Sequence, residues 1–188
     1  ISENKISTIE KGPYKSIGET DREIIDLKGG YVLPGFWNNH SHLSDLLPDV
    51  NDILGKENTV SSTIRAGRNA MDAIKRGFTS LRSTGSRDYL DVYWGKAFKD
   101  GVFIGPTIYP AGNPIAAVGG HGIDDYAWPA TIAINGPKEM RKAVREHVRM
   151  GVNWIKIMAD ELQDNEIIAA VQIAHQNNVK VVAHAAEE

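Results

Sequence analysis

The sequence predicts an α/β fold built on a parallel sheet. Five short apolar runs alternate with four segments of helical periodicity, which is the pattern of successive βα units. The runs are rich in β-branched, aromatic or other large apolar residues, which favour strands. The five predicted strands are residues 31–37, 78–83, 107–111, 154–158 and 180–183.

Apolar periodicity and stop residues predict the four connecting helices. Gly77 suits the left-handed conformation that often ends a helix. The periodicity places Ile64 and Met71 on the buried face of the first helix, and Met140 and Val144 on that of the third. The helices are expected at about residues 60–76, 89–99 and 137–150, and from residue 164 onward.

Residues 1–31 differ in pattern from the rest of the chain, and this pattern predicts a small β module. Residues 5–9 and 23–27 are strand-like runs separated by Gly12-Pro13 and Gly18, and we expect them to pair antiparallel. The expected domains are therefore 1–31 and 32–188.

The spacing of the predicted strands bears on the architecture. The strands recur about every 37 residues, so eight units would need about 296 residues. A closed (β/α)8 barrel typically takes roughly 250 residues, whereas 157 residues follow the β module. These residues could hold just over half of such a barrel, or the whole of a five-stranded doubly wound sheet.

Composition and charge exclude several classes of protein. With 41% hydrophobic and 24% charged residues, the chain is neither disordered nor fibrous. The net charge of -3 is spread in mixed sign, so neither nucleic acid nor a membrane surface is an expected partner. The chain has no cysteine, which excludes disulfides and Cys-based metal sites. We expect a cytoplasmic location, although a start at Ile1 without Met suggests a clipped N-terminus that would hide a leader.

Two histidines, His40 and His42, lie two residues apart at the C-terminal end of the first predicted core strand. Residues two apart on a strand point to the same face. Both imidazoles can then reach one point, as two ligands of one divalent metal must. A short His-x-His is also common as incidental loop composition, so the spacing alone leaves both interpretations open.

Lys156 lies inside an apolar strand, where an unpaired ammonium is rarely tolerated. It could extend its amine past the end of the sheet, act as a Schiff-base nucleophile, or be carbamylated by carbon dioxide to become a carboxylate ligand. His184 ends the fifth predicted strand. With His40 and His42, these residues all fall near the C-terminal ends of parallel strands, where α/β active sites are built.

The other three histidines receive different interpretations. His121 lies between glycines in a stretch that follows the third strand, so it could approach a ligand or belong to an ordinary loop. His147 and His175 lie in predicted helices and are expected on their surfaces, with no functional role.

Taken in order, these segments resemble the metal-dependent amidohydrolase superfamily, most closely its prolidase-like and imidazolonepropionase-like branch. The likeness runs over nearly the whole chain and is specific only when its parts are taken together. The segments that carry it are "DLKGGYVLPGFWNNHSH", "GFTSLRSTGS", "GPTIYPAGNPIAAVGGHG", "GVNWIKIMAD" and "AHQNNVKVVAHA".

The resemblance implies part of a (β/α)8 TIM-like barrel, about the first four βα units plus strand five, preceded by part of a small β-sandwich. It implies one or two divalent metal ions, usually zinc. His40 and His42 would bind one metal, carbamylated Lys156 would bridge two, and His184 would bind the second, while His121 would face the substrate. The implied reaction is hydrolysis of a C–N bond in an amide or peptide, by a metal-activated hydroxide attacking the carbonyl carbon.

The chain also departs from the family pattern. Asn38 stands where the family usually has Asp, and Arg82-Ser83 where it tends to Arg-Asp. The family's catalytic aspartate is expected beyond Glu188, in the remainder of the same polypeptide. Residues 1–188 alone are therefore expected to be inactive.

Three functional hypotheses remain. The first is a hydrolase of dipeptides or N-acyl amino acids, acting on a small amide or peptide substrate. The second is a Schiff-base lyase that uses Lys156. The third is a non-catalytic half-barrel that binds a partner or assembles into a homo-oligomer through its open sheet edges.

Overall fold

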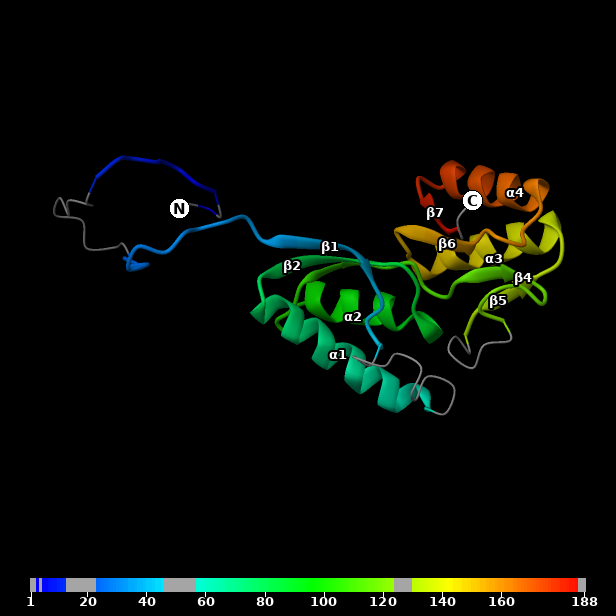
Figure 1. The fold of residues 1–188 in the computed structure, drawn as a ribbon, viewed down its shortest axis with the longest axis horizontal. Helices are drawn as coiled ribbons and strands as arrows, with labels where there is room; N and C mark the ends of the chain where they lie inside the picture. The colour runs from blue at the N-terminus through cyan, green and yellow to red at the C-terminus, as the bar shows by residue number, and fades with distance from the viewer. Residues whose placement is uncertain (1–2, 4, 13–22, 46–56, 124–129, 186–188) are drawn as a thin grey trace. The chain divides into compact units, whose positions relative to one another are not determined.

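The computed structural model describes residues 3, 5–12, 23–45, 57–123 and 130–185. The chain divides into two compact units, Ile1–Leu33 and Pro34–Glu188. Every candidate site residue lies in the second unit (Figure 1). Among the described residues, no helix has both the length and the apolar character needed to cross a membrane.

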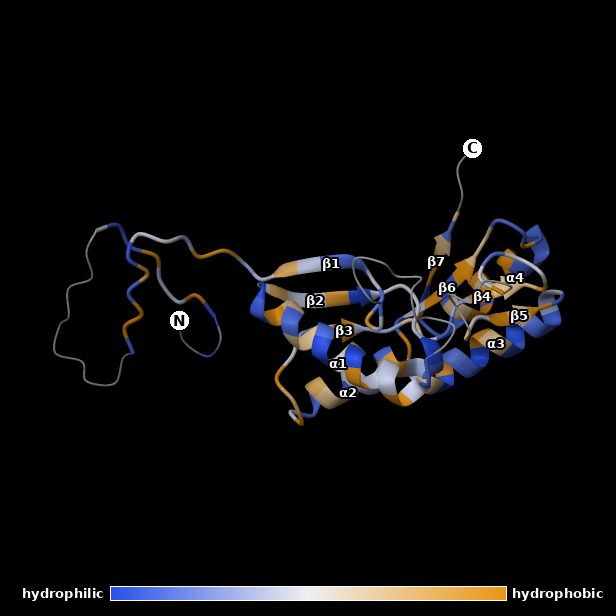
Figure 2. Cartoon of the chain, turned by 60° about the horizontal axis from the view of Figure 1, so that its bottom comes forward, coloured by the Kyte–Doolittle hydropathy of each residue, from blue (hydrophilic) through white to orange (hydrophobic). Residues whose placement is uncertain are grey.

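The described part of Ile1–Leu33 contains no strand. Lys5 forms an isolated bridge, and the runs 5–9 and 23–27 form no ladder with each other. Their large apolar side chains are exposed. Figure 2 colours the hydrophobic positions along this trace orange. The predicted antiparallel pair is therefore wrong, because two short runs bury too little apolar surface to hold a ladder by themselves.

The first sheet of the second unit has the order β1-β2-β3 and is parallel throughout. Helices α1 and α2 cover one face of it, and Ala66, Ala70, Leu81 and Ile108 form the core between them. A short 3-10 turn, Arg87–Tyr89, precedes α2. The elements are β1 (Phe36–Ser41), α1 (Thr59–Lys75), β2 (Phe78–Ser83), α2 (Leu90–Lys99) and β3 (Thr107–Tyr109).

The second sheet has the order β5-β4-β6-β7 and is also parallel. Helices α3 and α4 pack against each other and against this sheet, and strands β5 and β6 appear mostly hydrophobic in Figure 2. Fully buried Ile115, Val144 and Ile155 lie in this core. The elements are β4 (Ile115–Ala117), β5 (Ile132–Ile134), α3 (Pro137–Met150), β6 (Trp154–Met158), α4 (Asp164–Gln176) and β7 (Lys180–His184).

The predicted α/β class with parallel strands is confirmed, and the described strands form two open sheets without closing a barrel. Two strand predictions need correction. The first strand begins at Phe36 and ends at Ser41, later than the predicted range of 31–37. The third is shorter than predicted, and β4 and β5 were not predicted.

Candidate functional site

An irregularity in the pairing of β1 with β2 places His40 and His42 on one side of the sheet. Strand β1 carries one residue more than β2 across this stretch, and such a bulge redirects the side chains that follow it. Since neighbouring residues alternate between faces, His40 and His42 lie on the face opposite Ser41. We call this the helix-free face, because the helices cover the other side. The paired residues on either side of the bulge are Asn38 with Leu81 and Ser41 with Ser83.

The His42 ring is oriented by the chain that follows β2. Its Nδ1 lies 3.1 Å from the carbonyl oxygen of Gly85, and the Thr84 hydroxyl lies 3.4 Å from its Nε2. Because a carbonyl oxygen only accepts hydrogen bonds, Nδ1 donates and Nε2 keeps its lone pair. The ring centroids of His40 and His42 are 5.3 Å apart.

Both histidines of β1 have lowered pKa values. Burial is the largest cause for each, and the positive charge of Lys156 lowers both pKa values further. For His42, the Gly85 carbonyl and the Asp91 carboxylate oppose the shift in part. Lowering the pKa favours the neutral imidazole, which is the form that binds a metal.

Lys156 and His184 share the helix-free face of the second sheet. In the parallel register, Lys156 pairs with Val182 and Met158 pairs with His184, and alternate residues point the same way. Lys156 is only 2% exposed, which confirms that it is buried within its strand. Burial lowers its pKa, and the nearby Arg82 guanidinium lowers it further, while Asp160 has the opposite effect.

Arg82 adds a fixed positive charge to the same face. Its Nε donates to the carbonyl oxygen of Asn39 at 2.5 Å, and its guanidinium lies 5.3 Å from the centroid of the Trp154 ring. Arg82 lowers the pKa of both His40 and Lys156, so it lies close to both ends of the candidate site. Sequence reasoning noted Arg82 only as part of a departure from the family pattern.

His121 lies in an exposed turn that follows β4. Its ring is stacked on that of His184, with the centroids 4.8 Å apart. Its backbone N–H donates to Glu161 Oε2 at 3.2 Å, which anchors the turn. The structure therefore brings His121 into contact with the histidine at the end of β7.

The candidate site consists of four proposed ligands, His40, His42, Lys156 and His184, with His121 stacked on His184. The charges of Lys156 and His184 both act on His40 and His42, so the four residues lie within electrostatic reach of one another. Within the described ranges, however, no three His, Asp or Glu side chains lie close enough to hold a metal together. The donor chemistry suits a divalent metal, and an acidic group on Lys156 would supply the carboxylate that these histidines lack.

Sequence reasoning missed one buried carboxylate, Asp91, in the first turn of α2. It is fully buried and accepts hydrogen bonds from the backbone N–H groups of Ala111 and Gly112, at 2.8 and 3.0 Å. Burial raises its pKa, and these hydrogen bonds counteract the shift. An aspartate in a first helical turn is common, so the sequence carried no signal of its burial.

His147 is fully buried, so its predicted place on the helix surface is wrong. Its Nδ1 lies 2.8 Å from the Ala143 carbonyl oxygen and its Nε2 lies 2.7 Å from that of Asn113. The ring also packs against Tyr89. His147 therefore joins α3 to the chain between β3 and β4. His175 is exposed, as predicted.

Parallel strands with histidines at their C-terminal ends and a buried lysine within one of them are typical of barrel enzymes, whose active sites lie at that edge. The chain matches the Amidohydrolase family over residues 31–188 and belongs to that family. Members of this family are generally metal-dependent. The prediction of this family, and of part of its barrel, is confirmed.

Several known proteins are similar to the chain. Ochratoxinase from Aspergillus niger is 29% identical over 151 residues, covering 68% of this chain and 31% of its own length. A crystal structure of a prolidase complexed with N-methylphosphonate-L-proline matches with a TM-score of 0.76 and 28% identity, covering 91% of this chain and 47% of that one.

A crystal structure of an Xaa-Pro dipeptidase with bound methionine matches with a TM-score of 0.71 and 26% identity, covering 81% of this chain and 43% of that one. The chain thus spans about a third of the curated relative and just under half of these two solved structures.

Proposed function

We propose that the complete protein is a metal-dependent hydrolase of C–N bonds in amides or peptides. The observation that carries this proposal is the electrostatic proximity of four candidate ligands from two parallel sheets. His40 and His42 lie on the helix-free face of the first sheet, and Lys156 and His184 lie on that of the second. The charges of Lys156 and His184 act on both histidines of β1. Membership of the amidohydrolase family supports it.

In this proposal, His40, His42, His184 and carbamylated Lys156 hold one or two divalent ions, most simply zinc. A metal there would supply Lewis-acid polarisation of the substrate carbonyl and activation of water. The chain's own residues prepare the site, because the Gly85 carbonyl accepts the Nδ1 proton of His42 and so fixes the tautomer in which Nε2 carries the lone pair that would bind a metal. His121 faces the substrate, and the catalytic aspartate lies beyond Glu188.

Carbamylation of Lys156 needs carbon dioxide as its co-reactant. The lone pair of neutral Nζ forms a bond to the carbon of CO₂, one C–O π bond becomes a carboxylate, and a proton leaves Nζ for solvent. The lowered pKa of Lys156 supports this step, because it increases the fraction of neutral amine. The product is an anion. The positive charge of the nearby Arg82 guanidinium stabilises this anion, whereas it disfavours protonated Lys156.

The proposed substrates are dipeptides or N-acyl amino acids. The support is the similarity to solved structures described as a prolidase and as an Xaa-Pro dipeptidase, both above 25% identity. The remaining strands and loops of the protein are expected to set the side-chain preference, since loops carry specificity in such barrels.

The test compares metal content and hydrolysis in the complete protein and in two histidine variants. His42→Ala should lose bound zinc and hydrolysis of a dipeptide panel, whereas His175→Ala, at an exposed position on α4, should keep both. Metal content is measured by mass spectrometry after dialysis against chelator and reloading with zinc. A wild-type protein that holds no stoichiometric metal, or a His42→Ala variant that keeps it, would contradict the proposal.

The buried amine of Lys156 also suits the alternative of a Schiff-base lyase, because its lowered pKa makes it a better nucleophile. Borohydride treatment in the presence of carbonyl compounds separates the two. A reduced adduct on Lys156 would favour the lyase, whereas a carbamylated lysine forms no imine.

A further inference from the structure

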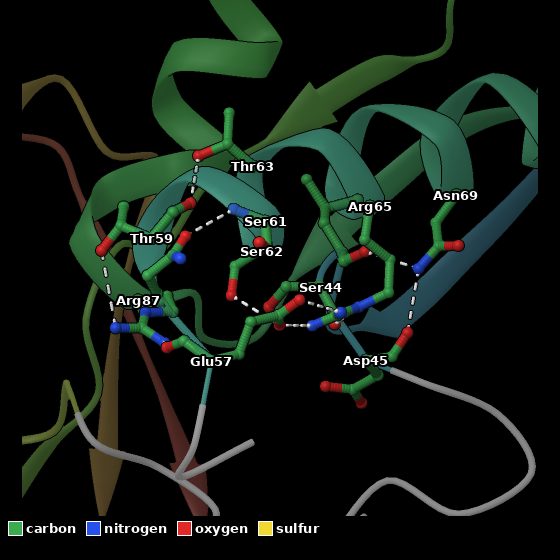
Figure 3. A network of polar contacts seen from close by, with 12 residues as sticks. Ser44, Asp45, Glu57, Thr59, Ser61, Ser62, Thr63, Arg65, Asn69 and Arg87 are labelled. Atoms are coloured by element: carbon green, nitrogen blue, oxygen red, sulfur yellow. Dashed lines mark hydrogen bonds and ion pairs between the residues drawn. The ribbon is translucent and has the colours of Figure 1, made fainter. Parts of the chain in front are cut away.

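A ring of polar contacts links the segment just after His42, the start of α1 and Arg87, and at its centre is the ion pair between Arg65 and Glu57 (Figure 3). Arg65 lies on α1, with its side chain 10% exposed, and Glu57 lies just before that helix, with its side chain 13% exposed. The pair is bidentate, because both terminal nitrogens of Arg65 donate to the two carboxylate oxygens of Glu57. Such a pair is directional as well as charged.

The first connection to His42 is through the backbone that directly follows it. The Nε of Arg65 donates to the carbonyl oxygen of Ser44 at 2.6 Å, only two residues beyond His42. Asn69, one turn further along α1, donates to the carbonyl oxygens of Leu43 and Asp45, both at 2.9 Å. Side chains of α1 therefore fix three successive carbonyl groups directly after the candidate ligand.

A second connection to His42 involves the Gly85 carbonyl group, which accepts a hydrogen bond from the His42 imidazole. The carbonyl oxygen of Glu57 accepts a hydrogen bond from Arg87 at 2.9 Å. Arg87 lies two residues beyond Gly85, whose carbonyl oxygen accepts from His42 Nδ1. The Arg65–Glu57 pair thus joins the segment that carries His42 to the segment that orients its ring.

We propose that Arg65 is a positioning residue for His42. It fixes the backbone just after His42 directly, through the Ser44 carbonyl, and it acts through Glu57 and Arg87 on the segment whose Gly85 carbonyl accepts the Nδ1 proton of His42. This inference rests on the proposed function, in which His42 Nε2 binds a metal. Residues that orient a ligand in this way typically contribute 10- to 100-fold to metal affinity. Arg65 touches neither metal nor substrate, so its effect passes entirely through the position of His42.

The guanidinium group is essential to this role. It donates from three nitrogens in a fixed plane, toward Ser44 on one side and Glu57 on the other. A lysine ammonium is a single point charge and cannot serve acceptors spread along a plane. Arg65→Lys therefore keeps the charge and most of the side chain but breaks the ring.

Helix α1 offers a matched control. Arg68 forms a similar pair with Asp72, but its side chain is 76% exposed and takes no part in the ring. The test therefore compares Arg65→Lys with Arg68→Lys, and Glu57→Gln with Asp72→Asn. Each is made in the complete protein and titrated with Zn²⁺ or Co²⁺ after removal of bound metal.

Arg65→Lys and Glu57→Gln should each weaken metal binding by about 10- to 100-fold, while the two controls stay within about twofold of the wild type. The double variant Arg65→Lys/Glu57→Gln should bind metal no more weakly than the single variant with the lower metal affinity, because both changes break the same ring. Loss of unfolding stability in Arg65→Lys with unchanged metal affinity would overturn the inference, since it would show a purely structural role. If Arg65→Lys does not fold, Glu57→Gln carries the comparison.

A second readout does not depend on metal. Nitrogen NMR of the apo protein should show His42 with its proton on Nδ1 in the wild type, and a mixture of tautomers in Arg65→Lys. A wild-type protein that binds no metal would contradict the proposed function, and the tautomer comparison would still decide this inference. A wild-type protein that binds metal, with an Arg65→Lys variant indistinguishable from Arg68→Lys in both readouts, would contradict the inference alone.

Discussion

The imidazole of His121 lies flat against that of His184, with ring centroids 4.8 Å apart and ring planes inclined by 14°. His184 belongs to the end of β7, whereas His121 belongs to an exposed turn after β4. The stack therefore joins a residue proposed to bind a metal to one proposed to face the substrate. The His121 side chain contributes both a flat ring and polar nitrogen atoms, and substitution separates the effects of the two.

His121→Phe should keep the ring against His184 but lose the polar nitrogens, whereas His121→Ala should lose both. We expect KM to rise about fivefold in both variants, since the loss of one hydrogen bond costs about 1 kcal/mol. Metal affinity should fall only in His121→Ala, because only that variant leaves the His184 ring unsupported. Steady-state kinetics and zinc titration measure the two effects. Equal metal affinity in both variants would show that the stack does not orient His184.

Asp45 should make the protein less stable at neutral pH. Burial raises its pKa from 3.8 to about 6, and Arg65 offsets only part of this shift. Between these two pH values the folded protein binds more protons than the unfolded chain, so stability falls as pH rises through this window. Asp45→Asn removes the buried charge and should add about 1 kcal/mol at pH 7, after allowance for partial exposure to solvent.

The pH dependence supplies the control for this variant. The advantage of Asp45→Asn should shrink as the pH falls below about 6 and vanish near pH 4, where both proteins are neutral at this position. Urea unfolding at pH 4, 5.5 and 7 tests the expectation. An advantage that is constant over this range would mean that ionisation of Asp45 is not its source.

Gly67 allows α1 and α2 to approach closely. A Cβ at this position would overlap the indole of Trp94, which is held by a hydrogen bond of 3.0 Å from its Nε1 to the Thr63 carbonyl oxygen. Gly67→Ala should therefore destabilise the fold by about 2 kcal/mol despite the better helix propensity of alanine. Gly95→Ala, on α2, meets no atom closer than 3.4 Å and should be neutral or more stable by up to about 1 kcal/mol. Thermal and urea unfolding compare the two, and similar losses in both would contradict this account.

Asp91 should be needed for the fold around the chain between β3 and β4. Asp91→Ala would leave the buried N–H groups of Ala111 and Gly112 without their acceptor, which should cost about 3 kcal/mol. Asp100→Ala, which removes an exposed partner of Lys96 just after the same helix, should leave stability unchanged. Urea unfolding gives both values. A small loss in Asp91→Ala would show that water or another group replaces the carboxylate.

The sequence predicted the order of strands and helices well, because those signals are local. The apolar faces of α3 and the glycine ends of the helices follow from periodicity and backbone conformation, and both were found. The start of β1 was predicted too early because Val32 and Leu33 look strand-like, yet Pro34 has no N–H to donate and both side chains stay exposed. Strand β4 is only three residues long and lies among glycines and prolines, so no period identifies it.

Other features depended on tertiary packing, which local patterns do not contain. Ile64, predicted to be buried, is 69% exposed, since the small residues Ala66 and Gly67 of α1 face the sheet and α2 instead. His147 does share the face of Met140 and Val144, but its polar side chain was interpreted as surface. The pair of Arg65 with Glu57 joins residues that look like ordinary helix-surface charges in the sequence. The close approach of the site histidines depends on the β1 bulge, which is defined only by the pairing with β2.

The pairing of β6 with β7 has a consequence for protein engineering. Because Met158 faces His184 across the ladder, a slip of one residue would turn His184 to the helix-covered side of the sheet. The short turn between α4 and β7, in which Asn178 has a positive φ of 58°, sets that pairing by its length. Designers who shuffle or transplant this half of the sheet can vary the side chains of the turn. A single inserted or deleted residue there, however, would turn His184 away from the site without altering any of the site residues.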